Sequence, residues 1–184
     1  MRLVQPSPEY LPGYVAALER GWSFDNLRGA VAAAEELAKI KEDPIEFVAS
    51  LENRQGGGTV TLPDGSKVPR IPGFRRWMWD GEFAGSIGLR WQHATAALPE
   101  YCLGHVGYAV VPWKQGLGYA TQALIAILAD AKSVGLPYLE ITTDAENLAS
   151  QRVIQKAGGV LQEKFNKPAA YGGAASLRFR VRLV

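Results

Sequence analysis

The sequence predicts an α+β fold in which a central mixed β-sheet carries helices on both faces. Three observations lead to this prediction: a helical block near the start of the chain, two alternating strands joined by Asp80-Gly81, and a strand–helix–strand unit over residues 103–143. A crossover of that kind is right-handed in nearly all proteins and implies a parallel pair of strands. The 184 residues suit one domain, and we find no linker that would divide positions 1–184.

The first part of the chain is predicted to be mainly helical. Apolar residues recur near helical spacing after Ser7, which we expect to cap the first helix, and the next segment is rich in Ala, Glu, Leu and Lys. Asp43-Pro44 is typical of a helix cap followed by the first helical residue. We expect a short strand at 2–5 and helices at 9–20, 30–41 and 45–52. Residues 59–69 form either a small hairpin around Asp64-Gly65 or a flexible loop.

The second part alternates strands with helices. Asp80-Gly81 is a favoured two-residue turn, and it joins predicted strands at 75–79 and 82–91. The clearest helix covers 119–134, because Leu124 and Ile127 share an apolar face and Gly135 ends it. A shorter helix is expected at 149–157, and further strands at 103–111, 138–143, 160–164 and 177–183.

Composition excludes several classes of protein. Lys and Arg number 20 and Asp and Glu 18, so the net charge of +2 argues against a nucleic-acid binder and against a polybasic membrane protein. Cys102 is the only cysteine, and His93 and His105 are the only histidines, so we expect no disulfide within the chain and no metal site. The first residues lack the apolar core of a signal peptide, which favours a cytoplasmic protein.

The segment from Gln115 to Ala120 holds the clearest chemical signal. An apolar strand runs through Pro112 into Gly116-Leu117-Gly118 and then directly into the predicted helix. Glycines allow unusual backbone angles and close approach of a ligand, and the first turn of a helix has unpaired N–H groups and a positive dipole end. The turn therefore predicts a site for phosphate or pyrophosphate, with an ordinary strand–helix turn as the alternative.

Two common phosphate-binding motifs do not match this turn. A P-loop requires Gly-x-x-x-x-Gly-Lys-Ser/Thr, which the sequence lacks. A dinucleotide-binding turn requires a third glycine where Thr121 stands, and too few residues follow to complete a doubly wound domain. A dinucleotide-binding module is therefore a distant alternative.

A family resemblance covers residues 75–183. Gln115 to Ala120 resembles the Gln/Arg-x-x-Gly-x-Gly/Ala signature of the GNAT superfamily of N-acetyltransferases. The stretch from Asn147 to Gly158 is similar to that superfamily's second coenzyme A motif, Asn-x-x-Ser/Ala before a helix that ends in Lys-x-Gly. The chain looks most like a branch of predicted bacterial acetyltransferases. The resemblance implies the GNAT fold, with a helical acceptor side over 1–74 and an acetyl-CoA-binding core over 75–184.

The resemblance also implies how acetyl-CoA binds. The pantetheine arm would lie between the strands at 103–111 and 138–143, against the main chain near Val111, and the N–H of Val110 would polarise the thioester carbonyl. Asn147 would reach the pantetheine with its side-chain amide, and Ser150 would lie beside the thiol. The pyrophosphate would meet the backbone N–H groups of the turn, which consists of Gln115, Gly116, Leu117, Gly118, Tyr119 and Ala120.

His105 and Ser150 are the predicted catalytic residues. Many family members carry a Glu near the start of the strand before the pyrophosphate turn, and that position falls here at Gly104 or His105. Imidazole titrates near neutral pH, so His105 is the candidate general base, with a histidine that hydrogen-bonds inside the sheet as the equal alternative. Several family members also use a tyrosine as general acid where this chain has Ile154, which leaves Ser150 as the candidate for that role.

The expected acceptor is an amine of a small molecule or peptide. Trp22, Phe24 and Asp25 lie on the helix connection that borders the acceptor cleft in this fold, and Arg90 ends a neighbouring strand. Core packing of Trp22 and Phe24 and helix capping by Asp25 are the alternative roles. We expect direct transfer in a ternary complex with no nucleic acid or membrane involved, and the resemblance leaves a homodimer open. Two alternatives also stay open: transfer from another acyl-CoA, or an acyl-CoA-binding regulatory module without turnover.

Overall fold

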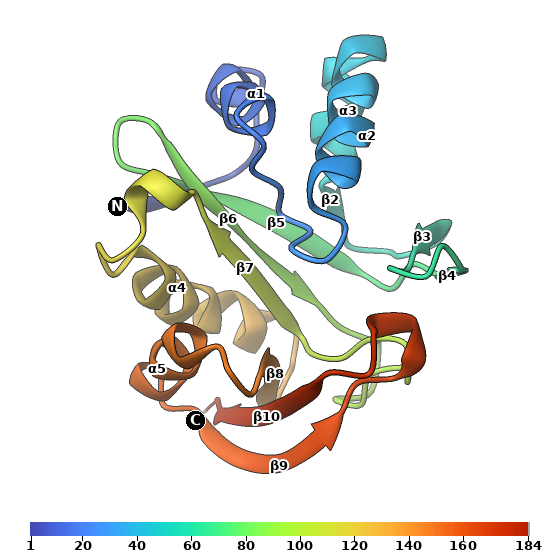
Figure 1. The fold of residues 1–184 in the computed structure, drawn as a ribbon, viewed down its shortest axis with the longest axis vertical. Coiled ribbons are helices and arrows are strands. Elements are labelled where there is room, and N and C mark those ends of the chain that lie inside the picture. The colour runs from blue at the N-terminus through green and yellow to red at the C-terminus, as the bar shows by residue number, and fades with distance from the viewer. Residues whose placement is uncertain (184) are drawn as a thin grey trace.

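The computed structural model describes residues 1–183, which form two antiparallel sheets and a separate hairpin (Figure 1). The first sheet has the order β1 (Arg2–Val4), β5 (Gly73–Trp79), β6 (Phe83–Arg90) and β7 (Val106–Val110), and β2 (Glu52–Asn53) also pairs with β5. The second sheet has the order β8 (Tyr138–Asp144), β10 (Ala175–Arg182) and β9 (Val160–Asn166). The hairpin joins β3 (Thr59–Thr61) to β4 (Lys67–Pro69).

Helices lie on both sides of the first sheet (Figure 1). One side carries α1 (Leu11–Glu19), α2 (Gly29–Glu42) and α3 (Pro44–Ser50), and the other carries α4 (Tyr119–Ser133) and α5 (Leu148–Lys156). Two short 3-10 helices, η1 (Pro112–Lys114) and η2 (Ala169–Tyr171), complete the elements. None of the helices within residues 1–183 combines the length and apolar character needed to cross a membrane.

Alternate residues of β5 supply two separate cores. Phe74 and Met78 pack in the core that includes α4 and the second sheet, whereas Trp77 packs on the opposite face with Tyr14 of α1. Successive side chains of a strand point to opposite faces, which explains the division. The rings of Trp77 and Tyr14 stack with their centroids 4.8 Å apart, and both side chains are fully buried. The first sheet is therefore held from both sides.

The α+β class is confirmed, and most predicted elements are present. The parallel strand pair expected within one mixed sheet is wrong, because the described strands pair antiparallel and β7 and β8 lie in different sheets. The hairpin at 59–69 forms, and Asp43 caps α3 by accepting hydrogen bonds from the backbone N–H groups of Ile45 and Glu46. The expected cap at Ser7 is wrong, because α1 begins only at Leu11 with Tyr10 as its N-cap. The Ser7 carbonyl instead accepts from the N–H groups of Tyr10 and Leu11, which forms a preceding turn.

The turn between β5 and β6 also differs from the prediction. Three residues, 80–82, separate the paired Trp79 and Phe83, and the register shifts between Met78 and Trp79. Gly81 has a φ of 114°, a backbone conformation that other residues rarely adopt. Asp-Gly suits a two-residue turn, but the loop has three residues, and the register shift leaves Ala84 as an extra residue in β6 opposite Met78 and Trp79.

Candidate active site

The two sheets are joined by hydrogen bonds at one point, beyond which the facing edges of β7 and β8 are unpaired, and we call this unpaired region the gap. His105 donates its backbone N–H to the carbonyl of Glu140 at 2.7 Å, and the N–H of Glu140 donates to Nδ1 of His105 at 2.9 Å. Among residues 1–183, no other backbone hydrogen bond joins residues 103–111 to β8. Instead, β7 pairs with β6 and β8 pairs with β10. The strand predicted at 103–111 is accordingly shorter, and the facing edges of β7 and β8 are open.

The open edge of β7 presents main-chain groups from alternate residues. The carbonyl of His105 and the N–H of Val111 both hydrogen-bond toward β6. Because hydrogen-bonding positions alternate along a strand, the main-chain groups of Val106, Tyr108 and Val110 point to the other edge, toward the gap. The sheet thus offers N–H and C=O groups to an extended ligand, as for an added strand. Val110 fits its predicted place at this edge, whereas the N–H of Val111 is used by the sheet.

The glycine turn follows β7 directly and leads into α4. Gly116 and Gly118 have φ values of 80° and 78°, so both need glycine for their backbone conformation. Gly118 is the N-cap of α4, which begins at Tyr119, and neither a capping side chain nor an acidic residue occupies its first turn. Residues 115–118 are exposed. The arrangement can bind an anion through helix N–H groups and the positive dipole end.

An ion pair holds this turn against the β5–β6 loop. Lys114 Nζ lies 2.6 Å from Oδ1 of Asp80, and the hydroxyl of Tyr119 donates to Oδ2 of Asp80 at 2.8 Å. The hydrogen bond from Lys114 is the main cause that lowers the pKa of Asp80. Tyr119, a predicted ligand of the pyrophosphate, therefore uses its hydroxyl to position the turn, and its backbone N–H remains the group that faces a ligand.

The second predicted motif opens α5. Asn147 is the N-cap of α5, and its Oδ1 accepts the backbone N–H of Ser150 at 3.0 Å. Ser150 in turn places its Oγ 2.8 Å from the hydroxyl of Tyr108 on β7. Sequence reasoning missed Tyr108, although its alternation with Gly107 and Ala109 could have directed attention to the α5 side of the sheet.

His105 is fully buried at the junction of the sheets. Its Nδ1 accepts the hydrogen bond from Glu140, so that nitrogen carries no proton, and its ring packs edge-on against Tyr138 at 6.1 Å. Burial lowers the pKa of His105 from its usual value, while Glu140 and the backbone of Ala96 act in the opposite direction. This geometry supports the alternative role, a histidine that hydrogen-bonds inside the sheet.

We therefore expect His105→Ala to destabilise the fold more than His105→Asn. The Oδ1 of asparagine can replace Nδ1 as the acceptor for the Glu140 N–H, whereas alanine leaves that N–H buried and unpaired, at a cost of about 1–3 kcal/mol. Chemical denaturation at pH 7.5 measures the difference. Equal destabilisation by the two substitutions would contradict the role of the hydrogen bond.

The same histidine predicts a pH dependence of stability. Because the pKa of His105 is lower in the folded than in the unfolded state, protons bind the unfolded chain first as the pH falls below about 6.5. The free energy of unfolding should then drop by up to about 1.4 kcal/mol per pH unit. Between pH 7.5 and pH 5.5 the His105→Asn variant should lose less stability than the unsubstituted protein. Parallel pH profiles would exclude the linkage.

The predicted acceptor residues occupy the other side of the first sheet. Trp22 is buried in the core beside Tyr14 and Phe83, which favours the core-packing alternative. Phe24 lies over the sheet where Gly88 pairs with Gly107. A Cβ on Gly88 would lie 3.4 Å from the Phe24 ring, and a Cβ on Gly107 would lie 3.8 Å from it. The glycine pair thus provides the space in which the α1–α2 connection docks.

Asp25 and Arg90 have distinct roles at this side. Oδ1 of Asp25 accepts the backbone N–H groups of Leu27 and Arg28 at 3.0 Å, a capping interaction before α2. Arg90 is exposed and donates from Nε to the carbonyl of Gly104 at 2.8 Å, and none of the described carboxylates forms an ion pair with it. Of Asp25 and Arg90, the guanidinium group of Arg90 is therefore the better suited to contact a ligand.

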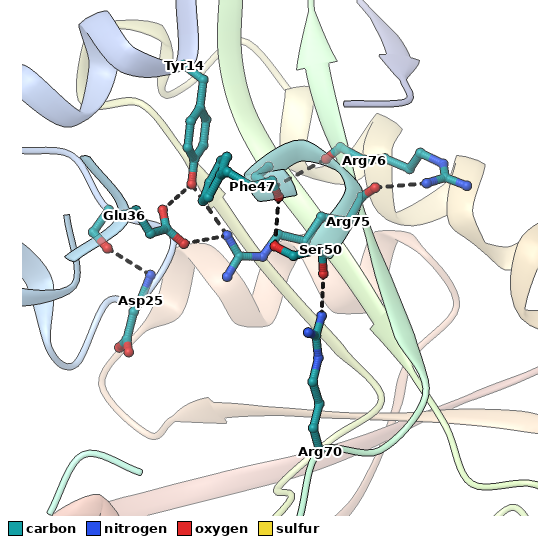
Figure 2. A network of polar contacts seen from close by, with 10 residues as sticks. Tyr14, Asp25, Glu36, Phe47, Ser50, Arg70, Arg75 and Arg76 are labelled. Atoms are coloured by element: carbon teal, nitrogen blue, oxygen red, sulfur yellow. Dashed lines mark hydrogen bonds and ion pairs between the residues drawn. The ribbon is translucent and has the colours of Figure 1, made fainter. Parts of the chain in front are cut away.

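A polar network behind Phe24 was not anticipated from the sequence. Tyr14 donates to Glu36 of α2, and Arg75 of β5 donates to Oε1 of Glu36 at 2.8 Å (Figure 2). Burial and the neighbouring Glu36 raise the pKa of Tyr14, with Arg75 acting against them. The guanidinium carbon of Arg75 also lies 4.4 Å from the centre of the Phe24 ring. The network ties α1, α2 and the α1–α2 connection to the sheet.

A pocket of about 410 Å³ lies next to the junction of the sheets. Its lining includes Cys102, Leu103, Glu140 and Arg178, and Glu140 is held by Arg180 at 2.6 Å. Tyr171 donates its hydroxyl to the carbonyl of Tyr101, the residue before Cys102, at 2.5 Å. Among residues 1–183 no group of three or more His, Cys, Asp or Glu residues is arranged to hold a metal ion.

Comparison with protein families gives one match. The model described as an acetyltransferase (GNAT) domain matches residues 65–160. This range includes β5–β8, the glycine turn, α4 and α5. No curated protein matches the sequence.

Solved structures share this fold at low sequence identity. The microcin C7 self-immunity acetyltransferase MccE, in complex with acetyl-CoA and AMP, is 13% identical, with a TM-score of 0.62 over 98% of this chain and 91% of its own. An acetyltransferase from Salmonella typhimurium that modifies the N-terminal serine of ribosomal protein L7/L12 is 13% identical, with a TM-score of 0.61 over 99% and 94%. The enzyme RimL in complex with coenzyme A has the same identity and TM-score over 98% and 93%.

Proposed function

Because this chain belongs to the GNAT family of acetyltransferases, we propose that it transfers an acetyl group from acetyl-CoA to an amine by direct transfer in a ternary complex. The observation that carries the proposal is the gap between β7 and β8, which lies beside the glycine turn that opens α4. Two solved structures of the same fold are complexes with acetyl-CoA or coenzyme A, which supports acetyl-CoA as the cosubstrate.

The residues around the gap fit the parts of acetyl-CoA. The open edge of β7 offers main-chain N–H and C=O groups to the amides of the pantetheine arm. The exposed turn at 115–118 and the first turn of α4 offer N–H groups to the pyrophosphate, and neither carries a carboxylate that would repel it. Asn147 has its oxygen engaged as the helix cap, so its NH₂ group is the part that would reach the pantetheine.

The chemical step requires little from the protein. Acetyl-CoA supplies the acetyl group as a thioester, and the N–H of Val110 would donate to the thioester oxygen as negative charge develops there. The surrounding strands hold this N–H at the open edge of β7, so its direction is set before the ligand binds. Buried His105 does not provide an exposed general base, so the amine would reach the site already neutral or lose its proton to water.

The acceptor would bind on the side of the sheet that carries Phe24. The exposed Arg90 lies near this side, because a Cβ on Gly107 would be 3.5 Å from Nη2 of Arg90 and 3.8 Å from the Phe24 ring. Burial is the main cause that raises the pKa of Tyr171. The nearby Arg90 acts against burial, and Asp25 acts in the same direction as burial. We propose an amine of a small molecule or a peptide N-terminus as the acceptor. The enzyme from Salmonella typhimurium acts on an N-terminal serine, which supports including peptides.

One experiment tests this proposal most directly. Release of the free thiol from acetyl-CoA should be followed with a panel of polyamines, amino acids, aminoglycosides and peptide N-termini, together with calorimetric binding of acetyl-CoA. We expect micromolar binding and amine-dependent thiol release with at least one class of acceptor. Absence of coenzyme A binding, or tight binding of NADH in its place, would overturn the assignment.

The same experiment separates two related functions. The observation in favour of a regulatory module that binds acyl-CoA without turnover is the burial of His105, which removes that histidine as an exposed base. Binding of acetyl-CoA without thiol release across the panel would support that function. Faster release from a longer acyl-CoA would support an acyltransferase with another donor.

A further inference from the structure

One side-chain contact joins β7 to α5. The hydroxyl of Tyr108 on β7 lies 2.8 Å from Oγ of Ser150, and 3.4 Å from the carbonyl oxygen of the same residue. Ser150 is in the first turn of α5, and the two residues are 42 positions apart in the sequence. The main chain of Tyr108 borders the open edge of β7, so the contact begins at a residue beside the gap.

The neighbouring part of α5 cannot supply a hydroxyl group. Ile154, one turn further along the helix, is fully buried in the core with Leu139 and Ile141 of β8. Tyr108 and Ser150 are therefore the hydroxyl groups that the described structure brings together between β7 and α5. Both side chains are partly buried, which strengthens a hydrogen bond between them compared with one in water.

Either hydroxyl can donate in this hydrogen bond, and the distances indicate which acceptor suits the Tyr108 proton better. The 3.4 Å separation from the Ser150 carbonyl is long for an O–H donor, whereas 2.8 Å to Oγ is ideal. With the Tyr108 O–H donated to Oγ, the hydroxyl proton of Ser150 is free to point into the gap. Burial raises the pKa of Tyr108, so this phenol keeps its proton at neutral pH.

We propose that Tyr108 is a positioning residue that acts through Ser150, holding the Ser150 hydroxyl so that its proton donates a hydrogen bond to the sulfur atom of coenzyme A. This inference rests on the proposed acetyl transfer. In that reaction the amine nitrogen forms a bond to the acetyl carbon, the carbon–sulfur bond breaks, and its electron pair goes to sulfur. The amine loses one proton to water, and the sulfur leaves as a thiolate that Ser150 stabilises.

The test compares ligands that differ only at sulfur. Coenzyme A and desulfo-coenzyme A, which has hydrogen in place of the thiol, should be titrated into the protein and into Tyr108→Phe, Ser150→Ala and the double variant at pH 8.5. Each single substitution should reduce the preference for coenzyme A about ten-fold, as expected for a hydrogen bond to a charged group. The double variant should lose no more than either single one, because both act through one contact.

A second readout separates positioning from packing. For an acceptor that the panel identifies, Tyr108→Phe should lower kcat about ten-fold with little change in the KM for acetyl-CoA. Tyr138→Phe is the matched control, since Tyr138 of β8 makes its recorded contacts to His105 and Arg180 through its ring. Thermal unfolding should show that both phenylalanine variants keep their fold.

The possible outcomes have distinct meanings. An unchanged preference for coenzyme A over desulfo-coenzyme A in Tyr108→Phe would overturn the inference, even with acetyl transfer intact. Equal loss of affinity for both ligands would also overturn it, because it would indicate a packing role alone. Failure of the unsubstituted protein to bind either ligand would instead reject the proposed function.

Discussion

Gly118→Asp should lower the affinity for acetyl-CoA at least about 100-fold, whereas Gly135→Asp should leave it nearly unchanged. Gly118 begins α4 and Gly135 follows its C-terminus, and their φ values are almost equal at 78° and 82°. At Gly118 a new carboxylate would face the pyrophosphate at the helix N-terminus. Two like charges about 4 Å apart near a protein surface repel by about 4 kcal/mol. This exceeds the roughly 2.8 kcal/mol that corresponds to a 100-fold loss of affinity. Titration calorimetry with acetyl-CoA measures the effect.

The two substitutions are matched in their effect on the backbone. A Cβ at Gly135 would meet no atom within 4 Å, and a Cβ at Gly118 would meet only the side chain of Gln122 at 3.9 Å. Both therefore carry the same strain of an aspartate at positive φ. The helix dipole makes the new charge favourable at Gly118 and unfavourable at Gly135. Gly118→Asp, the weaker binder of acetyl-CoA, should thus be the more stable of the two variants. Loss of acetyl-CoA binding in both variants would show that the effect is not local.

The glycine turn could be predicted because its signal is local. Gly116, Gly118 and the apolar face of α4 follow one another within a single strand–turn–helix segment, so residue spacing alone places the N–H groups together. The cap at Asn147 could be read in the same way, from its position just before α5. Such features depend on backbone conformation over a few residues, which sequence pattern describes well.

The side-chain pairs across the gap could not be predicted in this way. His105 meets Glu140, and Tyr108 meets Ser150, through contacts that depend on how two sheets and a helix are placed relative to one another. The residue types leave His105 equally suited to a catalytic base and to a buried acceptor. Its surroundings favour the buried acceptor, since the ring is fully buried and its Nδ1 accepts a hydrogen bond from a backbone N–H. The sheet junction could not be located from strand propensity, because His105 lies just before β7 and hydrogen-bonds both to Arg90 of β6 and to Glu140 of β8.

Adjacent glutamates of α2 should differ sharply in their contribution to stability. Glu36→Ala removes the acceptor shared by Tyr14 and Arg75, whose guanidinium group is then left partly buried without a counter-charge. Removal of one partner from a buried ion pair costs about 3–5 kcal/mol, and we expect about 3 kcal/mol because the Arg75 side chain keeps 26% of its exposure. Urea denaturation at pH 7 measures this loss in the free energy of unfolding.

Glu35→Ala is the matched control, because it makes the same change on the same helix. Glu35 pairs with Arg28 at the surface, its side chain is 49% exposed, and such pairs contribute about 0–1 kcal/mol. The network also holds Phe24 over the glycine pair on the acceptor side, whereas the glycine turn and α4 lie beyond the sheet. Glu36→Ala should therefore raise the KM for the acceptor and leave acetyl-CoA affinity within about two-fold at a temperature where the variant is folded. Equal destabilisation by Glu35→Ala and Glu36→Ala would mean that the network adds nothing beyond a surface ion pair. Loss of acetyl-CoA affinity in Glu36→Ala would show that the two sides of the sheet are not independent.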